Sequence, residues 1–175
     1  IGVLLNPNFL SYGNLTNVLA RSAFIGIIAV GMTFVVVSGG IDLSVGSMAA
    51  LIAGVMIVAM NALAAAADPP GATSIVLLGI GLALAFGAVF GVLHGFLIAR
   101  GRIEAFIVTL GTLGVFRAVL TWLSDGGALT LDYTLSETYS PVYYESLLGV
   151  PVPVWVFGLV AALGALILNR TAYGQ

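Results

Sequence analysis

The sequence predicts an all-α protein that crosses a lipid bilayer several times. Hydrophobic residues make up 61% of the 175 residues, charged residues make up only 7%, and the mean hydropathy is +1.18. A soluble domain needs a charged surface, and five Arg, no Lys and seven acidic residues cannot supply one. The apolar residues are also grouped into runs of roughly 20, the length that a helix needs to cross the hydrocarbon core.

Five such runs are expected to be spanning helices: Leu15–Val37, Leu43–Ala67, Ile75–Ala99, Ala105–Leu123 and Val150–Leu168. The first begins after a stretch in which Pro7 and Gly13 disfavour helix and Asn14 can serve as the N-cap. The turn Asp68–Gly71 separates the second run from the third, and Ala99–Glu104 separates the third from the fourth. Prolines open the fifth run, because a first helical turn tolerates them.

The gap between the fourth and fifth runs, residues 124–149, is expected to form an extracytoplasmic loop subdomain. It holds four acidic residues and four of the six tyrosines, and it has no Arg. Arg and Lys in short loops favour the cytoplasm, so Arg100, Arg102 and Arg170 predict which ends of the spans lie inside. Arg21, near the outer end of the first run, argues mildly against this orientation.

A polar break, "SGGIDLSVGS" at Ser38–Ser47, separates the first two runs. Gly39 and Gly40 can adopt positive φ, and Asp42 or Ser44 can cap the helix that follows. Irregular backbone at membrane depth is stable only where protein or water satisfies its polar groups, and broken helices mark transport sites in other membrane proteins. Asp42 is therefore interpreted as a structural cap, with a place on a translocation path as the alternative.

Five polar residues in or beside the apolar runs are candidates for a substrate pathway: Asp42, Ser44, Ser47, Thr109 and Arg117. A charge in hydrocarbon is costly, which makes Arg117 a functional candidate by default. The competing interpretation is that Arg117 snorkels to the outer interface or pairs with Asp125. Thr109 and Thr112 can instead hydrogen-bond to their own helix four residues back.

The third run carries small residues at every fourth position. They are Gly79, Ala83, Gly87, Gly91 and Gly95. Small residues at this spacing allow a neighbouring helix to approach closely, so we expect a helix-packing surface. A surface that lines a permeation path is the alternative.

No group of residues predicts an enzyme or a metal site. The only histidine, His94, has no acidic neighbour at ligand spacing, and a hydrogen bond in helix packing is expected for it. The sequence has no Cys, no Ser/His/Asp grouping, no phosphate-binding GxxxxGK[ST] loop and no basic nucleic-acid face. If transport consumes ATP, another chain must bind it.

Two segments carry a family resemblance: "AVGMTFVVVSGGIDLSVGSMAAL" at Ala29–Leu51 and "HGFLIARGRIEAFIVTLGT" at His94–Thr112. They resemble the permease subunits of bacterial ATP-binding-cassette importers for monosaccharides such as ribose, arabinose, xylose and galactofuranose. The resemblance spans nearly the whole chain. One departure is Glu104, where the family usually has Pro, so the start of the fourth run is expected to be capped differently.

The resemblance implies a multi-pass permease of the bacterial inner membrane that works as a homo- or heterodimer. It also implies cytoplasmic ATPase subunits that bind ATP and Mg, and an extracytoplasmic binding protein that delivers the sugar. Family members are longer, so residues 1–175 are expected to be one incomplete transmembrane domain, the front half of a permease. The alternatives are a branched-chain amino-acid permease, which "GIDLSVGS" disfavours, an ion-coupled carrier that uses Asp42 or His94 as a proton site, and a structural scaffold.

Overall fold

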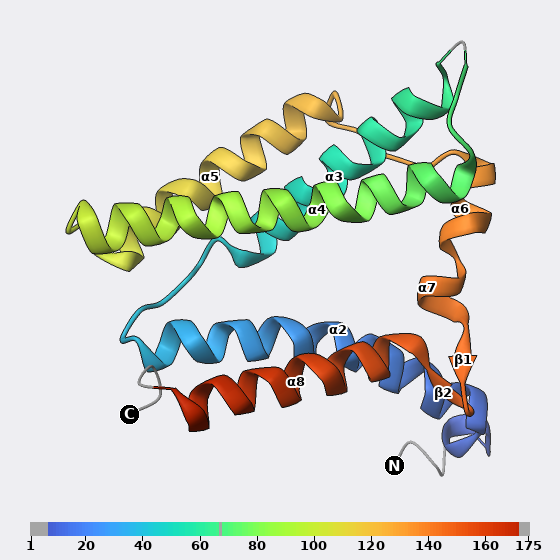
Figure 1. The fold of residues 1–175 in the computed structure, drawn as a ribbon, viewed down its shortest axis with the longest axis horizontal. Coiled ribbons are helices and arrows are strands. Elements are labelled where there is room, and N and C mark those ends of the chain that lie inside the picture. The colour runs from blue at the N-terminus through green and yellow to red at the C-terminus, as the bar shows by residue number, and fades with distance from the viewer. Residues whose placement is uncertain (1–6, 67, 172–175) are drawn as a thin grey trace. The chain divides into compact units, whose positions relative to one another are not determined.

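The computed structural model describes residues 7–66 and 68–171 (Figure 1). Five helices are long and apolar enough to cross a membrane, which confirms the predicted class. They are α2 (Tyr12–Val37), α3 (Val45–Ala64), α4 (Ala72–Gly95), which continues as the π-helix η2 (Phe96–Arg100), α5 (Ala105–Leu123) and α8 (Val152–Arg170). The shorter elements are the 3₁₀ helix η1 (Pro7–Leu10), α6 (Tyr133–Tyr139), α7 (Pro141–Tyr144), β1 (Ser146–Leu147) and β2 (Val150–Pro151).

The first spanning helix begins earlier than predicted. Ser11 has extended backbone angles and is the N-cap of α2, and its hydroxyl accepts a hydrogen bond from the N–H of Asn14 at 3.3 Å. Gly13 and Asn14 therefore lie inside the helix, and the prediction that Asn14 is the cap is wrong. Its side-chain amide instead donates to the carbonyl of Phe9 at 2.7 Å, which fixes η1 against the start of α2.

The chain divides into two compact units. The first, hereafter the α2–α8 unit, contains residues 1–38 and 140–175, and the second, the α3–α5 unit, contains residues 39–139. One boundary falls inside the polar break, directly before Gly39. The other falls inside the predicted loop subdomain, between Tyr139 and Ser140.

In the α2–α8 unit, two helices far apart in sequence pack side by side in the same direction (Figure 1). Gly26 of α2 lies against the ring of Phe157, and Gly164 of α8 lies against Val30. The antiparallel strands β1 and β2 precede α8, and the Tyr12 hydroxyl donates to the carbonyl of Gly149 between them. The shared direction is what α2 and α8 require as the first and last of five successive crossings.

In the α3–α5 unit, α3 packs against both α4 and α5. Met60 of α3, Ile75 and Val76 of α4, and Leu135 of α6 form a buried cluster at one end of this unit. Leu135 is only 2% exposed, because α6 folds back onto the ends of α3 and α4. The segment after α5 is therefore an ordered part of the helical unit.

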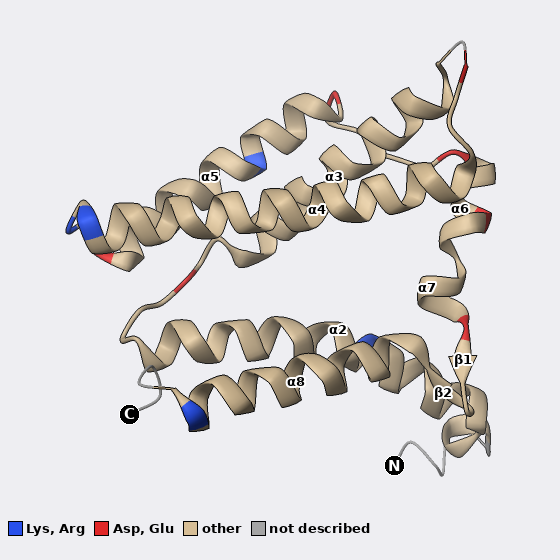
Figure 2. Cartoon of the chain, viewed as in Figure 1, with Lys and Arg blue, Asp and Glu red and all other residues tan. Residues whose placement is uncertain are grey.

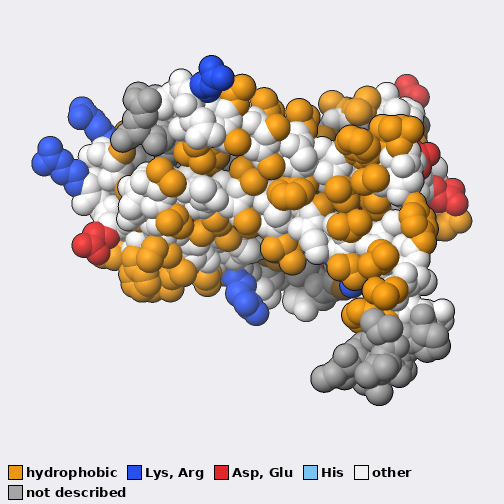
Figure 3. Space-filling model, turned by 90° about the horizontal axis from the view of Figure 1, so that it is seen from below, with side chains coloured by type: hydrophobic (Ala, Val, Ile, Leu, Met, Phe, Trp, Pro, Cys, Tyr) orange, Lys and Arg blue, Asp and Glu red, His pale blue; other side chains and the backbone are white. Residues whose placement is uncertain are grey.

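The surface suits a lipid environment. Large hydrophobic side chains are exposed along α2, α4, α5 and α8, and Figure 3 shows hydrophobic side chains covering much of the face in view. Arg117 is the only Asp, Glu, Lys or Arg in α3, α4 and α5. Figure 2 shows the other charges of the α3–α5 unit at helix ends and in connecting segments, where they can reach water.

Candidate functional site

The polar break between α2 and α3 is held by hydrogen bonds among its own residues. Oδ1 of Asp42 accepts from the backbone N–H and from the hydroxyl of Ser44, each at 2.7 Å. Ser44 is fully buried, and its carbonyl accepts from the hydroxyl of Ser47 at 2.8 Å. Gly39 has the expected positive φ, +82°, whereas Gly40 does not.

These bonds place Asp42 in a turn that ends at Ser44, the residue before the first turn of α3. Ser44 occupies the N-cap position of α3, but its side chain makes no capping hydrogen bond to the helix. Asp42 instead satisfies a backbone donor and a hydroxyl donor just before the first turn, where a carboxylate also meets the positive end of the helix dipole. A pathway role for its charge stays a prediction.

A hydrogen bond from α5 holds the break in place. The hydroxyl of Thr109, which is 2% exposed, lies 3.2 Å from the carbonyl of Ile41 and 2.8 Å from that of Ala105, four residues back in its own helix. Thr112 likewise bonds to the carbonyl of Val108 at 2.9 Å. The bonds within the helix were predicted, but the link to Ile41 was not, because the sequence does not say which segment lies beside α5.

A groove of about 730 Å³ lies between α3 and α5. It extends from Leu43 in the break to the turn after α5, and its α3 wall is formed by Gly46, Ser47, Ala50, Ala53, Gly54 and Ile57. This wall covers about 17 Å of helix, roughly half the thickness of a membrane's hydrocarbon core. The opposite wall carries Arg117, Thr121 and Ser124.

The structure brings together two of the five candidate pathway residues in this groove. Ser47 and Arg117 both line it, whereas Asp42, Ser44 and Thr109 do not. The side chain of Arg117 is exposed in this unit, and among the described residues no ion pair joins it to Asp125. The groove is thus largely apolar, with hydroxyl groups and one cation along its walls.

His94 connects α4 to α5. Its Nε2 lies 2.9 Å from the hydroxyl oxygen of Thr112, and its ring packs 5.9 Å from that of Phe116. The histidine is 7% exposed. The predicted helix-packing hydrogen bond is confirmed, and it ties together the two helices that flank the loop carrying Arg100 and Arg102.

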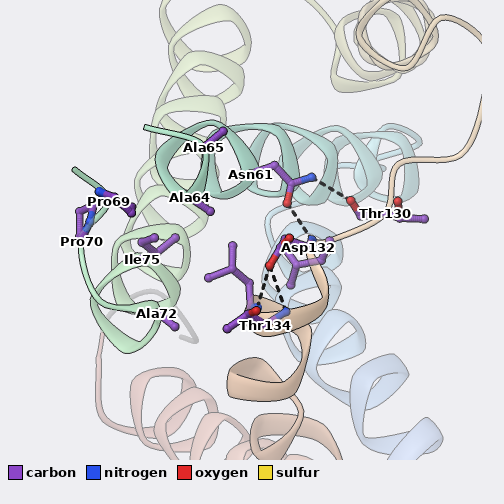
Figure 4. Close-up of a pocket in the computed structure, with 12 residues that line it drawn as sticks. Asn61, Ala64, Ala65, Pro69, Pro70, Ala72, Ile75, Thr130, Asp132 and Thr134 are labelled. Atoms are coloured by element: carbon purple, nitrogen blue, oxygen red, sulfur yellow. Dashed lines mark hydrogen bonds between the residues drawn. The ribbon is translucent and has the colours of Figure 1, made fainter. Parts of the chain in front are cut away.

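Asn61 holds the segment before α6 in place, a role that was not predicted from the sequence. Its amide nitrogen donates to the carbonyl of Thr130 at 2.8 Å, and its amide oxygen accepts from the N–H of Asp132 at 2.9 Å (Figure 4). Asp132 in turn caps α6 by accepting from the N–H groups of Thr134 and Leu135. An Asn in an apolar helix beside Asp68–Gly71 was the available signal, but the sequence does not show its partner 70 positions later.

The surface of α6 carries a hydrogen bond between the hydroxyl of Tyr133 and the carboxylate of Glu137, at 2.7 Å. This bond, with a smaller contribution from burial, raises the pKa of Tyr133 above its usual value. The phenol is therefore neutral throughout the physiological pH range and acts as a donor on the predicted outer face.

The small-residue stripe of α4 is contacted within the chain mainly at one end. A Cβ on Gly79 would lie 2.4 Å from the sulfur of Met60, and one on Gly87 would lie 4.0 Å from Ile52. A Cβ on Gly91 or Gly95 would meet nothing described within 4 Å. A packing role for the rest of the stripe, Ala83 included, stays a prediction.

Comparison with known proteins identifies the family. Residues 14–175 match the family described as "Branched-chain amino acid transport system / permease component". The chain belongs to this permease family. Family membership and five apolar helices make the permease a multi-pass protein of the inner membrane, and the resemblance inferred from the two motifs is confirmed.

The permease is similar to several curated proteins. It is 36% identical over 172 residues to the ribose import permease protein RbsC of Escherichia coli and 34% identical over 173 residues to that of Haemophilus influenzae. It is 30% identical over 169 residues to the L-arabinose transport system permease protein AraH of Escherichia coli. These alignments cover 97–98% of this chain but only 48–50% of each relative, so the chain spans about half their length. No solved structure was found to match it.

Proposed function

We propose that this chain is part of the membrane-spanning subunit of an ATP-driven importer that moves a monosaccharide across the bacterial inner membrane. In this proposal it pairs with a second permease copy. Cytoplasmic ATPase subunits bind ATP and Mg and power transport, and an extracytoplasmic binding protein delivers the sugar.

The observation that carries the proposal is the 34–36% identity, over 98% of the chain, to proteins named ribose import permeases. The α3–α5 groove supports it, because hydroxyl groups, small residues and one cation along a membrane helix suit a neutral polar cargo. The charge of Arg117 is expensive in hydrocarbon, so its place in the groove supports a water-filled or substrate-filled path.

Two alternative functions differ from the proposed one in the cargo or in the energy source. The family description names branched-chain amino acids, but an apolar amino-acid side chain gains nothing from Ser47, Thr121 and Ser124. An ion-coupled carrier needs a titrating group on the path. The structure gives Asp42 a partner in Ser44 and gives His94 a partner in Thr112.

Uptake by the complete permease, reconstituted in proteoliposomes with its ATPase subunits and binding protein, tests the proposal. We expect ATP-dependent uptake of a radiolabelled pentose and no uptake of leucine. ATP-dependent leucine uptake would replace the sugar assignment by the amino-acid assignment. Uptake driven by a proton gradient without ATP would overturn the ATP-driven mechanism.

A further inference from the structure

A second, shallower hollow opens on α5 beside the α3–α5 groove, and Arg117 lines both. The other side chains that line this outer hollow include Thr121, Trp122 and Asp125. These residues belong to the last two turns of α5 and the turn that follows it, and all of them line the same hollow.

The two charges of the outer hollow are held apart. Arg117 lies in α5, whereas Asp125 lies in the turn beyond its last residue, Leu123. Asp125 has a left-handed backbone, φ +48°, and the N–H of Gly126 closes the turn on the carbonyl of Thr121 at 2.9 Å. Trp122, which lines the same hollow, is 77% exposed. The hollow therefore offers hydrogen-bond donors from Arg117, acceptors from Asp125 and the aromatic surface of Trp122.

This arrangement matches the chemistry of a neutral sugar. A monosaccharide presents hydroxyl groups around its edge and C–H groups on its faces. A guanidinium is a fork of five donors and a carboxylate is purely an acceptor, so together they can bind several hydroxyl groups. An indole face covers the apolar side of the ring at small entropic cost. A simple anion would be repelled by Asp125 and a simple cation by Arg117, whereas the hydroxyl groups of a sugar can accept from Arg117 and donate to Asp125.

A purely interfacial role explains these residues less completely. Trp is frequent at membrane interfaces, and Arg side chains snorkel toward them. Those tendencies account for each residue singly. They do not account for the position of Arg117 at the junction of the outer hollow with a groove that also carries Ser47 and Ser124.

We propose that Arg117, Trp122 and Asp125 form an outer subsite for a monosaccharide, from which the sugar enters the α3–α5 groove past Arg117. This inference rests on the proposed function. It makes Arg117 a specificity-determining residue that contacts the substrate directly.

The test is uptake per assembled complex by the full permease with its ATPase and binding protein, for the transported sugar and its monodeoxy analogues. Each sugar is supplied at a saturating concentration of sugar-loaded binding protein. Arg117→Gln is expected to lower uptake about tenfold, with partial recovery in Arg117→Lys. One deoxy sugar will lack the hydroxyl group that Arg117 contacts. For this sugar, Arg117→Gln should lower uptake little further, because the effects of removing the two partners of one contact are not additive.

Variants of Trp122 test the second subsite residue, and a variant of Arg21 is the control. Trp122→Ala is expected to lower uptake about fivefold, and Trp122→Phe should restore most of it. Arg21→Gln removes an exposed arginine from α2, outside the hollow, and should transport like the wild type. ATP hydrolysis in the absence of sugar should be unchanged in Arg21→Gln.

Three results would overturn the subsite. The first is wild-type uptake by Arg117→Gln, and the second is wild-type uptake by Trp122→Ala. The third is that, for every deoxy sugar, the loss of uptake caused by Arg117→Gln adds to the loss caused by the missing hydroxyl group. If Arg117→Gln does not assemble, Arg117→Lys and the Trp122 variants decide. A wild-type complex that imports no monosaccharide would overturn the proposed function and the subsite with it.

Discussion

The α2–α8 unit and the α3–α5 unit hold their helices together by different means. In the α2–α8 unit the helices meet through glycines that receive large apolar side chains, as Gly26 receives Phe157 and Gly164 receives Val30. The polar links described there, from Tyr12 to Gly149 and from Trp155 to Leu147, reach the β1–β2 segment at one end of the unit.

In the α3–α5 unit, polar links join the elements at several levels. Thr109 bonds to the break, His94 bonds to Thr112, and Asn61 bonds to the segment before α6. Close approach also occurs, because Gly54 lies against Leu120. The groove and the outer hollow are both in this unit.

The difference follows from the solvent. Lipid tails are as apolar as Leu, so burial of apolar surface does not by itself join helices in a bilayer. Close van der Waals packing and interhelical hydrogen bonds are the remaining forces. Both units use close packing, and the α3–α5 unit adds hydrogen bonds between its elements. The unit that already contains polar groups is the one that can offer a polar path to a substrate.

The largest effect is expected at Gly26, where the close neighbour is a rigid aromatic ring. A Cβ there would lie 2.6 Å from the ring of Phe157, so Gly26→Leu should destabilise the α2–α8 unit by about 3 kcal/mol through overpacking. Thermal unfolding and yield of the complex in detergent measure this loss. Gly31→Leu is the matched control, because a Cβ on Gly31 of the same helix meets nothing described within 4 Å. Equal losses in both variants would contradict the packing interpretation.

Asn61 tests the polar links of the α3–α5 unit. Asn61→Ala removes both hydrogen bonds to the segment 130–132 and should lower stability by about 2 kcal/mol. Limited proteolysis should then cut near α6 faster than in the wild type. Asn61→Asp keeps the acceptor for the N–H of Asp132, so its stability and its rate of proteolysis should lie between those of the wild type and Asn61→Ala. Unchanged proteolysis of Asn61→Ala would show that the buried Leu135 alone holds this segment.

Asp42 separates a structural role of the break from a role in transport. Asp42→Asn keeps the accepting oxygen for Ser44 and should leave assembly and uptake near normal. Asp42→Ala should lower stability by about 1 kcal/mol and reduce yield before it reduces uptake per complex. A well-assembled but inactive Asp42→Asn complex would instead assign its charge to the pathway.

The smallest effect is expected for the link between α4 and α5. A double-mutant cycle with His94→Phe and Thr112→Val should give a coupling of about 0.6 kcal/mol, the size typical of hydrogen bonds between membrane helices. Thermal unfolding of the four proteins measures it. A coupling near zero would mean that the ring contact of His94 with Phe116 holds these helices without the hydrogen bond.

Hydropathy along the sequence predicted all five spanning helices, and the bounds of α5, Ala105–Leu123, agree with the structure. The break was also predicted, because Gly39 and Asp42 are local signals whose bonding partners lie within a few residues. The sequence did not predict contacts between residues that are far apart along the chain. It gave no sign that α2 lies beside α8, or that Asn61 binds the backbone at Thr130 and Asp132.

The contrast has a physical reason. Entry of a segment into a membrane depends on the sum of its own transfer free energies, which the sequence by itself determines. Helix pairing depends on which small residue meets which large one, and helices that are apolar on all sides carry little periodic signal of their partners. From the sequence, the packing surface was therefore predicted only from the regular spacing of small residues between Gly79 and Gly95. Only the tertiary structure decided that Gly26, Gly54 and Gly164 are closely packed, and that Ser47 and Arg117 share a groove.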